Sequence, residues 1–102
     1  MGKFSRERLA DSSIHSLLEA LPGWSFEANH IQKTFVNRTY MHGVAFAVAV
    51  AHLADELDHH PELTLEYPAV RVRIQTHDAG GVSALDFALA ERIEDLLHPS
   101  DG

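Results

Sequence analysis

Residues 57–78, LDHHPELTLEYPAVRVRIQTHD, alternate between apolar and polar side chains on both sides of Pro68. A period of two is typical of a strand that buries one face, and proline between two such runs is typical of a turn. The stretch therefore predicts a β-hairpin. Its apolar side chains are Leu63, Leu65 and Tyr67 in the first strand and Val70, Val72 and Ile74 in the second, whose polar side chains are Arg71, Arg73, Gln75 and His77.

The segment before the hairpin, HGVAFAVAVAHLADELDHH, fits two kinds of structure. Its valines alternate with glycine or alanine, as they would in a strand. Larger apolar residues nevertheless recur at helical spacing, namely Phe46, Val50, Leu53 and Leu57. We predict a helix of about 17 residues that Pro61 ends, because the residue before a proline avoids the α region. Val44 and Val48 lie beside this stripe, either in an oligomer contact or in ordinary core.

The remaining segments predict two more helices and a second hairpin. Residues 5–24 have helical apolar spacing until Pro22-Gly23 stops it, and residues 83–98 form the last helix. Two short alternating runs, Trp24 to Glu27 and Ile31 to Phe35, flank the turn-forming pair Asn29-His30. The apolar positions of the two helices are Leu9, Ile14, Leu17, Leu18 and Leu21 in the first and Leu85, Leu89, Ile93 and Leu96 in the last. The order αββαββα predicts an α+β fold, with one four-stranded antiparallel sheet and helices packed on one face.

Composition restricts the classes of function. A chain of 102 residues that is 45% hydrophobic and 23% charged is expected to fold as a single domain, residues 1–102. The net charge is -7 and Lys and Arg do not cluster, so direct nucleic-acid binding is not expected. The sequence has no cysteine, which excludes thiolate chemistry, and no apolar run long enough to span a membrane. We expect a cytoplasmic protein.

Three histidines are candidates for proton transfer, because the unperturbed pKa of histidine, about 6.5, suits that work near neutral pH. His59 and His60 are expected at the C-terminal end of the central helix, where Asp55 can face His59 across one turn and orient it. His77 is expected on the polar face of its strand. Taken singly, each fits a solvated histidine or a helix cap better than a catalytic role, and residue type alone leaves both interpretations open.

Other polar residues near these histidines also allow two interpretations. Asp86 follows Ser83 in the S-x-x-D spacing of a capping box, so it is expected to cap the last helix and can serve a site as well. Gly80-Gly81 is interpreted as a plain turn. Arg71 and Arg73 either face solvent or line a ligand groove, and their spacing does not decide between the two.

A metal site is the rival explanation for three histidines, because two histidines and a carboxylate can hold zinc or ferrous iron. Adjacent residues at a helix end diverge, however, unlike the i, i+4 pair of H-E-x-x-H. We therefore expect no metal at His59, His60 and His77. Nucleophilic catalysis has less support, since no serine lies in a G-x-S-x-G sequence.

An acidic residue, His-His-Pro, an aromatic residue, a third histidine and an aspartate follow one another in this chain. This order resembles the pterin-4a-carbinolamine dehydratase family over about residues 5–97. The residues that carry the resemblance are Asp55, His59, His60, Pro61, Tyr67, His77 and Asp86. Two positions depart from the family pattern: Asp55 lies where glutamate is common, and Leu63 lies where an aromatic residue is frequent.

The resemblance implies a dehydratase that converts 4a-hydroxytetrahydropterin into quinonoid dihydropterin and water, with no metal or organic cofactor. It implies His59 and His77 as acid and base, His60 as the residue that positions the pterin, and Asp86 as a group that orients a histidine or the substrate. The site residues are thus His59, His60, His77 and Asp86 for catalysis and Asp55, Pro61, Thr76 and Asp78 for binding or orienting the substrate.

The resemblance also implies partners. We expect a pterin as the small-molecule substrate, a homodimer or homotetramer, and a functional link to a phenylalanine hydroxylase. Two alternatives remain open. One is a non-catalytic oligomeric binding module, since an animal member of the family serves as dimerisation cofactor of a transcription factor. The other is a protein of another pterin pathway with a different substrate.

Overall fold

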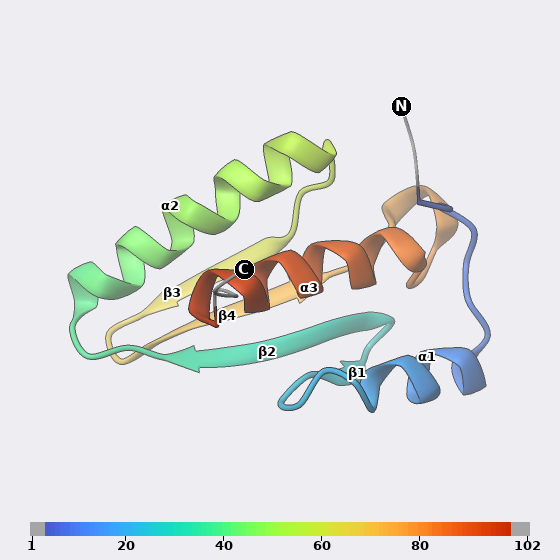
Figure 1. Ribbon diagram of the computed structural model, residues 1–102, viewed down its shortest axis with the longest axis horizontal. Coiled ribbons are helices and arrows are strands. Elements are labelled where there is room, and N and C mark those ends of the chain that lie inside the picture. Colours follow the sequence, from blue (N-terminus) through green and yellow to red (C-terminus); the bar gives the residue numbers. More distant parts are fainter. Residues whose placement is uncertain (1–3, 99–102) are drawn as a thin grey trace.

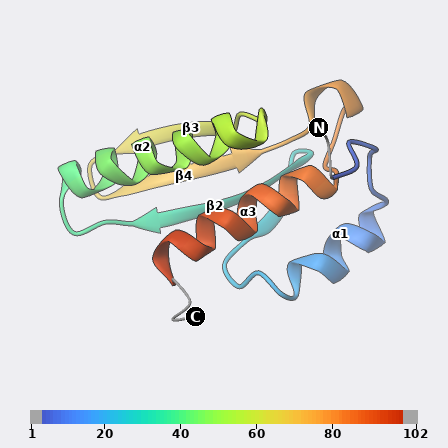
Figure 2. The same ribbon diagram turned by 45° about the horizontal axis from the view of Figure 1, so that its top comes forward.

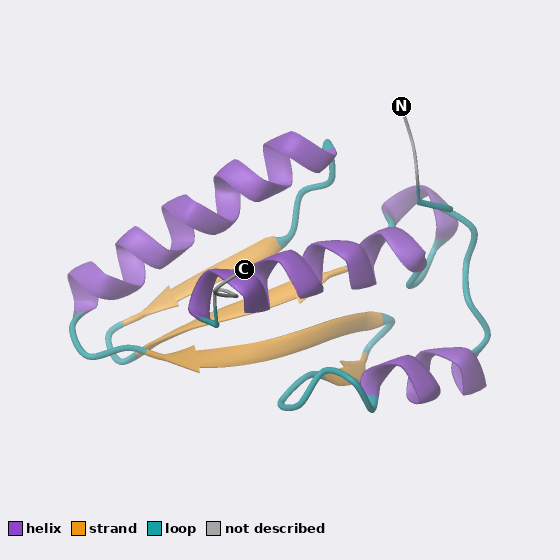
Figure 3. Cartoon of the chain, viewed as in Figure 1, coloured by secondary structure: helices purple, strands orange, loops and turns teal. Residues whose placement is uncertain are grey.

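The computed structural model describes residues 4–98, and the expected domain also includes residues 1–3 and 99–102, which lie outside the described residues. The elements follow the predicted order, as Figure 3 shows. They are α1 (Asp11–Leu18), β1 (Ser25–Glu27), β2 (His30–Val36), α2 (Tyr40–Leu57), β3 (Glu62–Glu66), β4 (Ala69–Ile74), the short 3-10 helix η1 (His77–Ala79) and α3 (Ala84–Leu97). The α+β prediction is confirmed.

The four strands form one antiparallel sheet in the order β1-β2-β4-β3, so β4 lies between β2 and β3 (Figure 1). The predicted alternation is confirmed along β4, where Val70, Val72 and Ile74 are fully buried while Arg71 and Arg73 are only partly covered. The helices lie on the face that these apolar side chains share, as the turned view in Figure 2 shows. The opposite face of the sheet carries the polar side chains.

A single hydrophobic cluster joins the helices to the apolar face of the sheet. Ile14 of α1, Val50 of α2 and Leu89 of α3 are all buried in it together with apolar side chains of β2 and β4. The predicted α2 stripe is confirmed, since Phe46, Leu53 and Leu57 pack against the same cluster. Burial of apolar area at roughly 25 cal/mol per Å² is what holds these layers together. Among residues 4–98, the longest helices are too short or too polar to cross a bilayer.

Some predicted apolar positions are not buried. Tyr67 follows the end of β3 and is 76% exposed, because the chain is already turning there toward β4. Leu17 and Leu96 are also exposed, so the apolar stripes of α1 and α3 are shorter than predicted. The first helix is shorter too, since Leu9 and Leu21 lie outside α1, although both contact the core.

The first hairpin turns at a different pair of residues from the predicted one. Ala28 and Asn29 have φ of 51° and 62°, and both positive values match the two-residue turn that suits the twist of a hairpin. The predicted turn at Asn29-His30 is therefore wrong by one residue. His30 becomes the first residue of β2 and pairs with Glu27.

The end of α2 has a different cause from the predicted one. Asp58 adopts the left-handed conformation with φ of 51°, and its N–H and the N–H of His59 bond back to carbonyl oxygens of the last turn. The helix thus ends at Leu57, before Pro61 can act on it. His59, His60 and Pro61 form the connection to β3 instead of the last turn of the helix.

Candidate active site

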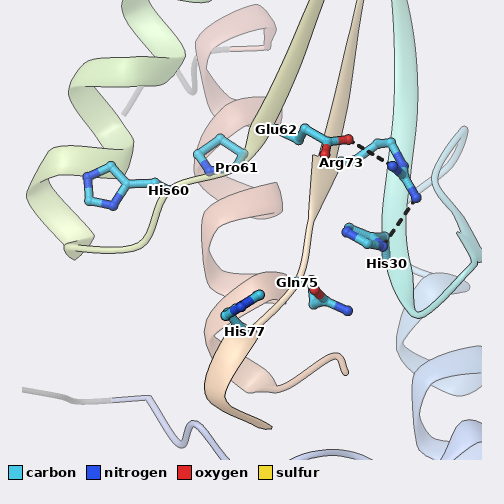
Figure 4. Close-up of a pocket in the computed structure, with 7 residues that line it drawn as sticks. All are labelled: His30, His60, Pro61, Glu62, Arg73, Gln75 and His77. Carbon is cyan, nitrogen blue, oxygen red and sulfur yellow. Dashed lines mark hydrogen bonds and ion pairs between the residues drawn. The ribbon is translucent and has the colours of Figure 1, made fainter. Parts of the chain in front are cut away.

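A cavity of about 260 Å³ opens where the polar face of the sheet meets the connection between α2 and β3. Figure 4 shows the side chains around it, which come from β2, β3, β4 and the segments beside them. The lining residues are His30, His60, Pro61, Glu62, Arg73, Gln75 and His77. Three of the expected site residues, His60, Pro61 and His77, are among them, and His59, Asp86 and Thr76 are not.

His59 and Asp86 form a buried pair that does not line the cavity. His59 is only 4% exposed and Asp86 is not exposed at all. Nε2 of His59 lies 2.5 Å from Oδ1 of Asp86. A carboxylate only accepts, so Nε2 carries a hydrogen and donates it, and Nδ1 is the ring nitrogen that this contact leaves unused. The structure thereby brings together two expected residues that are distant in the sequence.

The second carboxylate oxygen of Asp86 is also fully used. Oδ2 accepts from the backbone N–H of Ser83 and from the hydroxyl of Thr76, both at 2.8 Å. The first contact is the expected cap at the start of α3. Thr76 is completely buried, and its oxygen also lies 2.5 Å from the hydroxyl oxygen of Ser83. Thr76 therefore orients Asp86 and does not reach the cavity.

Asp55 bonds to a different histidine from the expected one. Its Oδ1 lies 3.1 Å from Nε2 of His60, not His59, and both side chains are largely exposed. The reason is the left-handed turn at Asp58, which sends His59 inward and His60 outward. An exposed pair of this kind contributes less than about 1 kcal/mol, so it places His60 only loosely.

His77 lies in η1 and not in a strand as predicted, because β4 ends at Ile74. Its exposed side chain lines the cavity. The glycines after it make a plain turn, as expected: Gly80 has φ of 69°, and Gly81 accepts from the N–H of Thr76.

Asp78 does not line the cavity and accepts from Arg6, with 3.3 Å between Oδ1 and Nη2. The hydrogen bond from Arg6 is the main reason why the pKa of Asp78 lies below its usual value, and the nearby charge of His59 adds a minor contribution. Contact with Arg6 gives Asp78 no direct role toward a ligand.

Arg73 lines the cavity, in agreement with the interpretation that these arginines line a ligand groove, and Arg71 does not line it. Arg73 Nη1 donates to Glu62 at 2.8 Å and Nε donates to Gln32 at 3.1 Å. His30 and Glu62 were not predicted. Had the first turn been placed one residue earlier, the period of two along β2 would have put His30 on the polar face beside Gln32.

In the part of the chain that the structure describes, no three His, Asp or Glu side chains converge in a way that could hold a metal ion.

Comparison with known proteins identifies relatives over nearly the whole chain. The family model described as Pterin 4 alpha carbinolamine dehydratase matches residues 7–96. A protein of Thermomicrobium roseum named "Putative pterin-4-alpha-carbinolamine dehydratase" is 39% identical over 89 residues, which cover 87% of this chain and 96% of the relative. A protein of Natronomonas pharaonis with the same name is 43% identical over 90 residues, which cover 88% and 96%.

A solved structure agrees with these relatives. The crystal structure of a transcriptional coactivator/pterin dehydratase from Brucella melitensis superposes with a TM-score of 0.83 at 32% identity, and the match covers 88% of this chain and 98% of that one. The sequence resemblance is thus confirmed by family, relatives and fold. This chain belongs to the pterin-4a-carbinolamine dehydratase family.

Proposed function

We propose that this protein dehydrates 4a-hydroxytetrahydropterin to quinonoid dihydropterin. The observation that carries the proposal is the meeting of His60 and His77 on one cavity, with the adjacent His59 bonded to buried Asp86, in a chain of this family. The two cavity histidines come from separate segments, the α2–β3 connection and η1. A flat heterocycle can therefore meet imidazole groups from two directions.

The reaction needs one acid and one base. The C4a–O bond breaks, and the leaving hydroxide takes a proton from the acid to become water. The base removes the proton from N5, and the C4a=N5 double bond forms with that electron pair. Histidine suits both steps because it holds and releases protons near neutral pH.

We assign proton transfer to His77 and His59, and positioning of the pterin to His60. His77 is exposed to the cavity. His59 is not among the lining residues, so proton transfer through it requires the substrate to reach Nδ1, the ring nitrogen that the contact with Asp86 leaves unused. His60 lines the cavity but has only the exposed Asp55 to hold it, which suits binding better than proton transfer. Asp86 is a positioning residue that acts through His59, and Pro61 shapes the cavity wall.

The test follows ultraviolet absorbance after a hydroxylase generates the carbinolamine. His59→Ala and His77→Ala are each expected to lower kcat, whereas His60→Ala is expected to raise KM. His42→Ala is the matched control, since this histidine is exposed at the opposite end of α2. Activity is expected to survive a chelator. No acceleration over buffer by folded wild-type protein would overturn the proposal and favour a binding role or a different pterin.

The proposal includes an oligomer that works in the cytoplasm beside an aromatic amino acid hydroxylase such as phenylalanine hydroxylase. Support for the oligomer comes from the outer side of α2, where Tyr40, Met41 and Val48 are exposed. Light scattering coupled to size exclusion is expected to show a dimer or tetramer. Val48→Asp should reduce that mass, and a wild-type monomer at micromolar concentration would contradict the expectation.

A further inference from the structure

The guanidinium group of Arg73 is fixed in place at the cavity wall. Arg73 pairs in register with Gln32 on one side and Glu62 on the other. Its Nε donates to Gln32 and its Nη1 donates to Glu62, and the side chain is only 24% exposed. Two bonds from a planar group determine where its third nitrogen points.

That third nitrogen, Nη2, faces an atom that cannot accept its hydrogens. It lies 3.2 Å from Nδ1 of His30, which itself lies only 2.7 Å from the carbonyl oxygen of Ala28. The carbonyl oxygen can only accept, so the closer contact requires a hydrogen on Nδ1. Nδ1 then has no lone pair for Arg73. Within residues 4–98, Nη2 has no other hydrogen-bond acceptor.

The cavity does not share the acidic excess of the whole chain. The whole protein carries -7, yet the cavity is lined by Arg73 and three histidines against a single carboxylate. That carboxylate, Glu62, already accepts from Arg73. An arginine N–H with no acceptor at a cavity wall is a donor suited to a carboxylate or phosphate oxygen.

We propose that Arg73 is a specificity-determining residue, which binds an anionic group on the side chain of the substrate. In Figure 4, Arg73 and His30 lie toward one end of the cavity and His60 and His77 toward the other. A pterin whose ring meets the histidines would extend its side chain toward Arg73. The orientation of the ring rests on the proposed function. A volume of about 260 Å³ is just below the usual ~300–1,000 Å³ of small-molecule sites, which suits one compact ligand.

Two stable pterins of similar size test the inference by calorimetric titration. 6-Carboxypterin carries the anion, and 6-hydroxymethylpterin is the neutral match. Wild-type protein is expected to bind the carboxylate roughly 10- to 100-fold more tightly, as a charge-assisted hydrogen bond would provide. Arg73→Gln should abolish the preference and Arg73→Lys should restore part of it. Arg71→Gln, on the same strand face but off the cavity, should leave it unchanged.

The phosphate ester of 6-hydroxymethylpterin distinguishes a phosphate site from a carboxylate site. Whichever binds more tightly, this ester or 6-carboxypterin, shows which anionic group Arg73 recognises. Equal affinity for charged and neutral pterins, a preference that survives Arg73→Gln, or no binding of any pterin would each overturn the inference. The dehydration assay is independent of these results. Turnover without a charge preference rejects only this inference, and a charge preference without turnover rejects only the proposed reaction.

Discussion

Nε2 of His59 donates to Oδ1 of Asp86, and this buried contact joins the connection between α2 and β3 to the first turn of α3. The same carboxylate caps α3 and accepts from Thr76, so a single side chain makes all three contacts. One aspartate thereby couples the stability of a helix to the tautomer of a proposed catalytic histidine.

Asp86→Asn is expected to lower kcat strongly and the free energy of unfolding moderately. If the amide oxygen keeps the contacts with Ser83 and Thr76, its NH₂ group faces His59 and forces the hydrogen from Nε2 to Nδ1. We expect kcat to fall by roughly 10²-fold or more and the free energy of unfolding to fall by about 1–3 kcal/mol. Urea denaturation and the dehydration assay measure the two. Asp95→Asn, on the exposed side of α3, should change neither; an unchanged kcat in Asp86→Asn would contradict the role of the tautomer.

The two adjacent histidines should differ in their effect on folding. His59→Ala leaves Asp86 buried without its partner, which typically costs about 3–5 kcal/mol of unfolding free energy. His60→Ala removes only an exposed pair and should cost less than about 1 kcal/mol. Denaturant unfolding of both variants measures the difference. If His59→Ala does not fold, His59→Gln retains a donor and supplies the comparison. Equal losses of unfolding free energy in the His59 and His60 variants would contradict the buried contact between His59 and Asp86.

Stability should decrease in acid partly through Glu94. Burial, the largest single influence, raises the pKa of Glu94, but hydrogen bonds from Lys33 and Trp24 outweigh it, so the pKa lies below the usual value of 4.5. A lowered carboxyl pKa stabilises the folded state above the unfolded pKa, and this contribution is lost as pH falls through the folded value. The difference in urea midpoint between wild type and Glu94→Gln should therefore be constant from about pH 6 to 8 and shrink below about pH 4.5. Exposed Glu91→Gln is the control, and a difference that grows in acid would reverse the assignment.

The left-handed turn at Asp58 should tolerate glycine better than alanine. Because φ is 51° there, a side chain costs roughly 1 kcal/mol that glycine avoids. Asp58→Gly is thus expected to be about 1 kcal/mol more stable than Asp58→Ala. Thermal unfolding of the two variants measures this directly. Equal midpoints would mean that the conformation of residue 58 relaxes in the variants.

Periodicity alone predicted most of the elements. The stripe of Phe46, Val50, Leu53 and Leu57 correctly favoured a helix over a strand, and the alternation of Val70, Val72 and Ile74 correctly predicted the buried face of β4. These patterns are local, and every turn of helix or pair of strand residues repeats them. A turn has no such repeating pattern of residues. Positive φ occurs at Ala28, Asn29 and Asp58. Asparagine and aspartate adopt it more readily than most residues, but they also occur in many other conformations, so residue type alone did not locate these turns.

The sequence by itself determined the element order, the buried faces and the family, because these depend on spacing along one chain. Only the tertiary structure decided which polar groups meet. The pairing of β2 with β4 places His30 beside Arg73. The turn at Asp58 allows His59 to contact Asp86 and His60 to contact Asp55. Contacts between distant segments depend on which strands become neighbours and on how each connection turns. Neither the order of the strands nor the path of a connection leaves a periodic pattern in the sequence.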